Sequence, residues 1–263
     1  MKKLSVLLVA ISILLSSLCL LGATDKNFMP DKLWHALIEG NLEKVKGFDA
    51  DINKKHKYTG GGALHGAAGS NRADLPLIKY LVEEKKLDIN AKDKKGNTPI
   101  LELVDRMIVA FGKTKEAKKA KQIRNILDIA KYLISKGADI SAVDEHGAGV
   151  LEGAVNQGIE VVKFFVDKGA NVNQLKTLKI EGKIWDQSTP FSQACMGGEL
   201  DIVKYMVQKG KSKISPESIR LAKKSIAEIL KVIDYGKKKI EEQERNIQQV
   251  AKIVNSLKVK AKK

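Results

Sequence analysis

The strongest constraint on the fold of this chain is a pattern that recurs about five times between residues 32 and 210. Each unit combines parts of a Gly-x-[Asn/Ser]-Thr-Pro start, a central glycine, a Val/Ile pair and a Lys-Gly-Ala-Asp/Asn-Ile/Val end. The units occupy 32–53, 61–90, 96–141, 147–173 and 188–210. Gly137 and Gly169 are 32 residues apart, which is close to a 33-residue period. Such a period is typical of stacked units that bury their apolar faces only against each other.

Local chemistry predicts two helices in each unit. Thr98-Pro99 and Thr189-Pro190 place a capping hydroxyl before a proline in the first helical turn. Glycines that suit a left-handed C-cap follow the second helix at Gly137, Gly169 and Gly210. Apolar pairs spaced i,i+4 mark one face of that helix: Ile129/Leu133, Val162/Val166 and Val203/Val207. The spacing therefore predicts helix pairs that present an apolar stripe to the neighbouring unit.

These shared positions resemble the ankyrin repeat family over about 180 residues. The resemblance implies an all-α fold, an ankyrin-repeat solenoid of about five helix–turn–helix repeats with β-hairpin fingers over 30–212. His65 occupies the histidine of the family motif, whereas Leu101, Glu152 and Ser192 replace it in other units. The hydrogen bonds that the family histidine makes are in doubt there, so we expect a loose, moderately stable stack.

The period is broken first by an insertion over 105–125. Its Lys/Ala/Glu composition favours an extended helix. The basic residues on it are candidates for an anion-binding face, directed at acidic protein, anionic lipid or nucleic acid: Lys113, Lys115, Lys118, Lys119, Lys121 and Arg124. The alternative is a solvated helix extension without a ligand.

A second insertion, over 174–187, predicts an elongated β-hairpin finger. Leu178 and Ile180 alternate with lysine, Glu181-Gly182 can form the turn, and Ile184-Trp185 return along the second strand. A tryptophan carried on such a finger can anchor a protein interface. The alternative is that Trp185 packs back on the repeats.

Residues 1–23 have the pattern of an export signal. Two lysines precede an apolar run from Leu4 to Ala23, with small residues near its end. At 20 residues the run could also remain as a membrane anchor. We expect an exported protein, periplasmic or membrane-anchored, with secretion or a surface lipoprotein through Cys19 as weaker alternatives.

The last part of the chain, 215–263, is predicted to be a basic helical extension that caps the final repeat. Ser215 and Pro216 start a first helix, and a second begins near Lys237. Every seventh residue is β-branched: Ile219, Ile226, Ile233, Ile240, Ile247 and Val254. Because Gly236 and Gln243 interrupt the complementary heptad positions, the second helix could either fold back or self-associate as a short coiled coil.

The net charge of +16 is concentrated outside the repeats. Segment 112–124 has six basic residues and one acidic residue, and segment 211–263 has fifteen basic and six acidic residues. The neutral repeat body, the export signal and the scarcity of aromatic residues in the basic clusters argue against a nucleic-acid partner.

No catalytic, metal or cofactor site is predicted. Gly112-Lys113-Thr114 lacks the glycine that a phosphate loop needs five positions earlier, where Met107 stands. The histidines His35, His56, His65 and His146 lie in different segments without metal-ligand spacing. Cys195 occupies a small core position, which predicts a buried and unreactive thiol.

These observations predict a non-catalytic module that binds another protein in the cell envelope or outside the cell. The expected contact residues are Lys94, Lys95 and His146 at finger tips, and Trp185 on the long finger. The alternative function is a membrane-anchored scaffold whose basic helix and tail bind anionic lipid or an acidic partner. Self-association through 215–263 is a further expectation.

Overall fold

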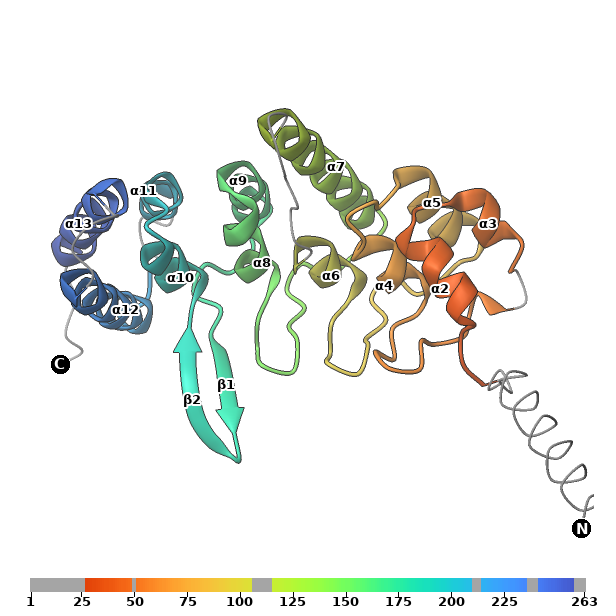
Figure 1. Ribbon diagram of the computed structural model, residues 1–263, viewed down its shortest axis with the longest axis horizontal. Coiled ribbons are helices and arrows are strands. Elements are labelled where there is room, and N and C mark those ends of the chain that lie inside the picture. Colours follow the sequence, from red (N-terminus) through yellow and green to blue (C-terminus); the bar gives the residue numbers. More distant parts are fainter. Residues whose placement is uncertain (1–26, 49–50, 106–114, 210–213, 236–240, 258–263) are drawn as a thin grey trace, which may run out of the picture.

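A computed structural model describes residues 27–48, 51–105, 115–209, 214–235 and 241–257 of the chain (Figure 1). The described chain is mostly helical, as expected, with one pair of short strands. Several predictions fall at least partly on residues that are not described: the export signal at 1–23, part of the insertion at 105–125 with Lys113, the helix cap at Gly210, and the start of the second C-terminal helix near Lys237. No described helix is long and apolar enough to cross a membrane.

The helices form consecutive pairs that lie side by side in two rows (Figure 1). The inner row comprises α2 (Asp31–Ile38), α4 (Ala63–Ala68), α6 (Pro99–Asp105), α8 (Val150–Gln157), α10 (Pro190–Gly197) and α12 (Pro216–Tyr235). The outer row comprises α3 (Leu42–Lys46), α5 (Leu75–Lys79) with the π-helical turn η2 (Tyr80–Glu84), α7 (Lys115–Ser135), α9 (Ile159–Asp167), α11 (Leu200–Lys209) and α13 (Glu241–Ser256). Connecting turns project from the inner row to one side of the molecule.

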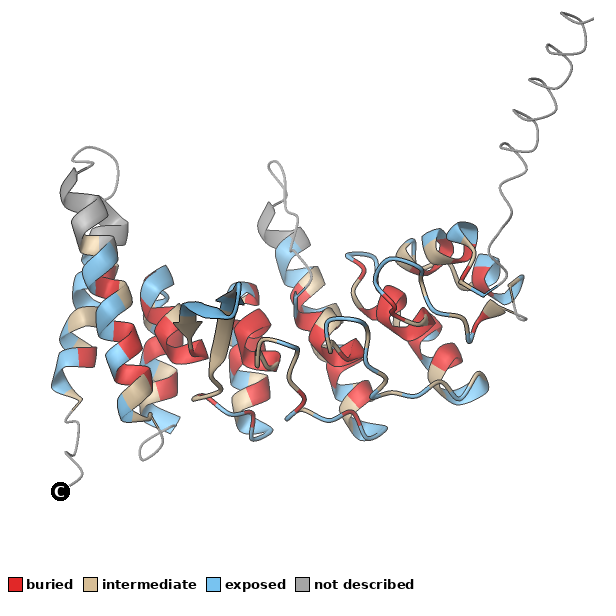
Figure 2. Cartoon of the chain, turned by 90° about the horizontal axis from the view of Figure 1, so that it is seen from below, coloured by how far each residue is buried: buried red, intermediate tan, exposed pale blue. Residues whose placement is uncertain are grey.

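The core lies between the rows and between neighbouring pairs, where the buried residues follow one another along the molecule (Figure 2). Ile129 and Leu133 on α7 are fully buried, as are Val162 on α9 and Val203 on α11. Val166 and Val207, the other members of the predicted pairs, pack against this core and are partly buried. The predicted apolar stripe is therefore confirmed. Each fully buried aliphatic side chain contributes about 2 kcal/mol to folding.

The predicted helix ends are confirmed at most described positions. Thr189 caps α10, because its hydroxyl accepts the Ser192 N–H at 3.2 Å and Ser192 Oγ accepts the Thr189 N–H at 2.8 Å. Gly137 and Gly169 have φ of +95° and +93° at the ends of α7 and α9. Thr98 differs from the prediction, because its buried hydroxyl makes no hydrogen bond with a described residue. Leu101, in the place of Ser192, cannot complete the reciprocal bond.

The expected β-hairpin fingers are wrong for two of the turns between helix pairs. At residues 93–97 and 144–148 the described backbone forms short turns rather than strands. In the first, Asp93 Oδ1 accepts the N–H groups of Lys95 and Asn97, both at 2.8 Å. Asp144 closes the second turn in the same way. The backbone closes each turn as well, with Asp93 N–H donating to Asn97 O and Asp144 N–H to Ala148 O, both at 3.0 Å.

The long finger is confirmed as a hairpin. Strand β1 (Lys176–Ile180) pairs antiparallel with β2 (Lys183–Ser188), and the insertion at 174–187 contains most of it. The turn residues Glu181 and Gly182 both have positive φ, +51° and +76°. This is the conformation of the two-residue turns that match the twist of a hairpin.

Of the two arrangements considered for the second C-terminal helix, the structure has the folded-back one. α12 packs on α10, and α13 packs on α10, α11 and α12, so the two helices continue the inner and outer rows (Figure 1). The β-branched residues Ile219, Ile226, Ile247 and Val254 are buried in the common core. α13 is described from Glu241, four residues after the predicted start at Lys237. Four of the six β-branched heptad residues are therefore buried within the chain, the side chains of Ile233 and Ile240 lie outside the described part, and self-association stays a prediction.

Candidate binding surface

The projecting turns form one continuous surface, which we call the tip face: residues 57–61, 93–97, 144–148 and the β1–β2 hairpin. The second and third turns and the hairpin each donate one backbone hydrogen bond to the turn before. These bonds are Lys94 N–H to Thr59 O at 3.0 Å, Glu145 N–H to Lys95 O at 2.7 Å, and Thr177 N–H to His146 O at 2.7 Å. The tip face is thus held together by its own backbone and is ordered before any ligand arrives.

All four predicted contact residues lie on the tip face, in different environments. Lys94 and Lys95 are exposed, but the Lys94 ammonium donates to the carbonyl of Lys57 at 2.7 Å. His146 is half-buried, and its Nε2 lies 3.7 Å from the Glu145 carboxylate. Trp185 is 71% exposed and lies within strand β2 of the hairpin. The alternative in which Trp185 packs back on the helices is therefore wrong.

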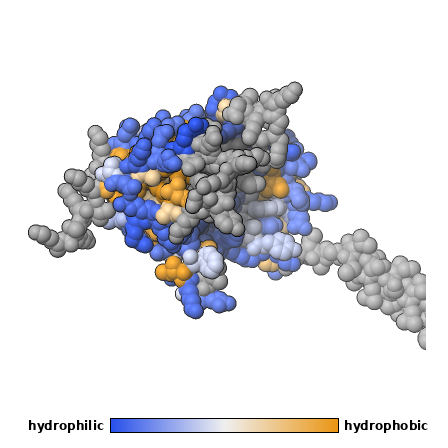
Figure 3. Space-filling view, turned by 60° about the vertical axis from the view of Figure 1, so that its left-hand side comes forward, coloured by the Kyte–Doolittle hydropathy of each residue, from blue (hydrophilic) through white to orange (hydrophobic). Residues whose placement is uncertain are grey.

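A β-bulge sets the direction of Trp185. The register passes from Leu178↔Asp186 to Lys179↔Ile184, which leaves Trp185 as the extra residue on β2. A bulge twists the strand and redirects the side chain at that point. Ile184 beside it is 59% exposed. Figure 3 shows hydrophobic surface next to hydrophilic surface on the hairpin below the body.

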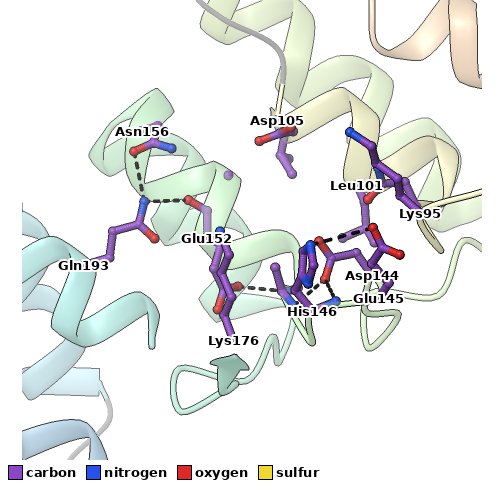
Figure 4. Close-up of a pocket in the computed structure, with 15 residues that line it drawn as sticks. Lys95, Leu101, Asp105, Asp144, Glu145, His146, Glu152, Asn156, Lys176 and Gln193 are labelled. Atoms are coloured by element: carbon purple, nitrogen blue, oxygen red, sulfur yellow. Dashed lines mark hydrogen bonds and ion pairs between the residues drawn. The ribbon is translucent and has the colours of Figure 1, made fainter. Parts of the chain in front are cut away.

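A pocket of about 230 Å³ lies between the tip face and the inner helices (Figure 4). Lys95, His146 and Lys176 line it from the turns and the hairpin base. The helix side contributes Asp105 from α6, Glu152 and Asn156 from α8, and Gln193 from α10. The structure thus brings two predicted residues, Lys95 and His146, next to five that the sequence analysis did not assign to a site.

Glu152 is the least expected member of this pocket, because its carboxylate is buried with only 6% of the residue exposed. Its Oε2 accepts the Gly149 N–H at 2.9 Å, whereas Oε1 has no hydrogen-bond partner among the described residues. Burial raises the pKa of Glu152 to about 7, although the Gly149 bond and the Lys176 charge oppose the shift. The only sequence signal was the departure from the motif histidine at this position.

His65 shows what the motif residue does in this chain. Its Nδ1 accepts the Gly62 N–H at 3.2 Å, so the proton resides on Nε2, which donates to the Asn97 carbonyl in the next helix pair at 3.0 Å. Glu152 reproduces the first bond but not the second, and Ser192 bonds only within its own helix turn. The doubt raised by the substitutions is therefore confirmed for the bonds between pairs. The looseness of the stack stays a prediction.

The anion-binding candidates lie on the first turns of α7, which extend past the neighbouring outer helices (Figure 1). Lys119, Lys121 and Arg124 are exposed, whereas Ile123 between them is buried. Lys115 and Lys118 lie on the same helix, but their side chains, like Lys113, are outside the described part. The predicted helix is confirmed, and three of its six basic residues form an exposed group.

The candidates for chemistry remain separate in space or inaccessible. Cys195 is fully buried, and burial raises the pKa of its thiol to about 12. This confirms the buried thiol, which stays protonated at neutral pH. His56 stacks on Trp34 with ring centroids 4.2 Å apart, far along the chain from His146. Among the described residues, no group of three or more His, Cys, Asp or Glu is arranged to hold a metal ion.

No protein-family model matches the sequence, and no curated protein is significantly similar to it. Three features of the described chain could bind a ligand: the tip face, the pocket and the basic turns of α7. Of these, the tip face and the pocket are contiguous, since Lys95, His146 and Lys176 belong to both.

Proposed function

We propose that this chain is an ankyrin-repeat protein that binds another protein through the tip face and acts without catalysis. Support comes from the recurring motif, the side-by-side helix pairs and the turns on one side of the inner row. The hydrogen bonds between successive turns add to this, because a preformed surface loses little conformational entropy on binding.

The observation that carries this proposal is the exposure of Trp185 and Ile184 at 71% and 59%. A large aromatic side chain on a projecting hairpin gives the folded chain no burial energy. In protein interfaces such a residue is often an anchor, and its truncation costs about 2 kcal/mol or more of binding energy. Lysines and acidic residues around the hairpin provide the polar rim that surrounds such anchors.

We further propose that the partner is found in the cell envelope or outside the cell, in the periplasm or at a membrane. The support is the lysine-led apolar segment at 1–23, which has the composition of an export signal. Retention of that segment would anchor the protein, and cleavage would release it. Recording the intact mass of the protein from native cells distinguishes the two outcomes.

Site-specific photo-crosslinking in native cells tests the proposed function. A photoreactive amino acid replaces Trp185 in one variant and Lys131, an exposed residue of α7 in the outer row, in the control. We expect a discrete crosslinked product from position 185 and none of the same mass from position 131. Equal products from both positions, or none from position 185, would refute binding through the tip face.

A second candidate function is electrostatic binding to an anionic surface by the first turns of α7. It is favoured by the exposed group Lys119, Lys121 and Arg124, which extends beyond the neighbouring helices. Such binding increases by about 1 kcal/mol per basic residue near the surface and weakens with salt.

Vesicle sedimentation tests this second candidate. Replacement of these three residues by glutamine should reduce binding to vesicles that contain anionic phospholipid, and added salt should abolish the difference. A matched variant removes three scattered exposed lysines instead: Lys92, Lys168 and Lys204. The same loss in both variants would show that only net charge matters and would exclude a specific role for α7.

A further inference from the structure

The buried carboxylate of Glu152 is not explained by the folding of the chain. A buried charge is normally paired or fully hydrogen-bonded, because desolvation otherwise costs several kcal/mol. Glu152 Oε2 accepts the Gly149 N–H and the residue's own backbone N–H also favours the carboxylate, whereas Oε1 makes no hydrogen bond with a described residue. His65 at the corresponding position of α4 has a partner for each ring nitrogen. Glu152 therefore has an unused acceptor where the chain elsewhere places a satisfied residue.

Two other polar groups on the helix side of the pocket, Gln193 and Asp105, also offer acceptors. The amide N–H₂ of Gln193 donates to the Asn156 side-chain oxygen at 3.0 Å and to the Glu152 carbonyl at 3.3 Å. This leaves the Gln193 side-chain oxygen available to accept. The Asp105 carboxylate is exposed and makes no ion pair with another described residue. The helix side of the pocket thus offers acceptors at Glu152, Asp105 and Gln193, next to the donor N–H₂ groups of Asn156 and Gln193.

The charges around the pocket favour a cation. Its lining contains four carboxylates (Asp105, Asp144, Glu145 and Glu152) against the two ammonium groups of Lys95 and Lys176. The Asp144 carboxylate accepts the N–H groups of His146 and Ala148 in its own turn. The Glu145 carboxylate lies 3.7 Å from His146 Nε2. Neither pocket lysine lies within 4.0 Å of a described carboxylate oxygen. Glu152 and Asp105 therefore remain for a positive group from outside.

We propose that the pocket receives an arginine side chain of the protein partner, whose guanidinium donates to Glu152 Oε1 and to Asp105 or Gln193. A guanidinium carries five N–H donors in one plane, which suits several acceptors around a cleft. The volume of about 230 Å³ is below the range of about 300–1,000 Å³ for small-molecule sites and suits one long side chain. This inference depends on the proposed function, because it assigns a chemistry to the partner of the tip face.

Binding requires a small local adjustment. Glu152 Oε1 is covered in the free protein, and the Lys176 side chain lies beside the carboxylate (Figure 4). A change of side-chain rotamer at Glu152 or Lys176 would expose the oxygen, and such changes are common when proteins associate. An isolated arginine should consequently bind weakly, and the rest of the tip face would supply most of the affinity.

NMR titration of the full ¹⁵N-labelled chain tests the inference with a defined probe, the tripeptide acetyl-Gly-Arg-Gly-amide. The reporter is the Gly149 N–H, which donates to Glu152 Oε2. We expect a saturable shift of this signal with the arginine peptide and none with the citrulline peptide, which has the same shape without the charge. Equal shifts with the two peptides, or no saturable shift with arginine, would overturn the inference.

Two variants locate the binding group. Glu152→Gln preserves the shape and removes the charge, and should weaken the arginine peptide about tenfold or more. Glu160→Gln removes an exposed carboxylate of α9 that lies outside the pocket lining, and binding should stay within about twofold. Unchanged amide spectra away from the pocket show that both variants fold. Equal affinity of Glu152→Gln and the unmodified chain would overturn the assignment to Glu152.

The outcome is distinguishable from that of the crosslinking experiment. The titration uses purified protein and does not depend on Trp185. If Trp185 crosslinks a partner but the arginine peptide does not bind, only the arginine inference fails. If position 185 gives no crosslink, the proposed function fails. A saturable shift with the arginine peptide would then show that the pocket binds arginine but not as part of a tip-face interface.

Discussion

The second and fourth helix pairs have different residues at an equivalent position, the third residue of the inner helix. It is His65 in α4 and Glu152 in α8. His65 joins its pair to the next by donating to the Asn97 carbonyl, whereas Glu152 leaves one oxygen unpaired beside a pocket. Both side chains accept the N–H of a glycine three residues earlier. The comparison shows that one position can serve stability in one pair and present a binding group in another.

The largest expected effect in this comparison is at the histidine. His65→Leu removes both ring hydrogen bonds and leaves the Gly62 N–H and the Asn97 carbonyl without them. Each unmade buried bond costs about 1–3 kcal/mol, so we expect a loss of about 3 kcal/mol in the free energy of unfolding. Equilibrium denaturation in urea measures it. A loss below about 1 kcal/mol would show that the bond between pairs contributes little.

The next effect concerns the glycine that follows Glu152. A Cβ added at Gly153 would lie 2.8 Å from the backbone of Val104 in α6, so α8 would have to shift away. We expect Gly153→Ala to lower the free energy of unfolding by about 2 kcal/mol, because overpacking outweighs the gain of about 1 kcal/mol in helix propensity. Urea denaturation measures the change. A more stable variant would mean that the two pairs are not closely packed.

At the glutamate the expected effect has the opposite sign. Glu152→Gln removes a charge that burial disfavours, as the pKa of about 7 against an ordinary value of 4.5 indicates. We expect the variant to be more stable than the unmodified chain by about 1–2 kcal/mol at pH 8. Urea denaturation at that pH measures it. Combined with weaker arginine binding, this gain would indicate a residue kept for binding rather than for folding.

The two residues also predict opposite dependences on pH. The raised pKa of Glu152 means that its contribution is fully present below pH 4.5 and is lost as the pH rises to about 7. Burial lowers the pKa of His65 below 6.5, so its contribution is present above pH 6.5 and is lost as the pH falls. The stability difference between Glu152→Gln and the unmodified chain should therefore be near zero at pH 4 and largest above pH 7. A constant difference would contradict this titration.

The smallest expected effect on stability is on the hairpin. Trp185→Ala removes a side chain that is 71% exposed, so the free energy of unfolding should change by less than about 0.5 kcal/mol. The same change should abolish most crosslinking when the photoreactive group is placed at the adjacent Ile184. A large loss of stability would show that the tryptophan supports the fold and is not held for a partner.

Several local features could be predicted from the sequence because they depend on neighbouring residues. The capping hydroxyl of Thr189, the turn at Glu181-Gly182 and the helix ends at Gly137 and Gly169 are examples. The two short turns were mispredicted as hairpins for a related reason. Whether a strand pair or a short turn forms there depends on what the Asp93 and Asp144 carboxylates bind. In the structure each accepts N–H groups of its own turn.

The sequence by itself determined the helical content, the order of the helix pairs and the long hairpin, since periodic apolar residues and turn chemistry act over a few residues. Only the tertiary structure decided that α13 folds back on α11 and α12, because burial of Ile247 and Val254 requires a surface from distant helices. The same holds for the pocket. Lys95, Glu152 and Gln193 are far apart in the chain, and their meeting depends on how three helix pairs pack.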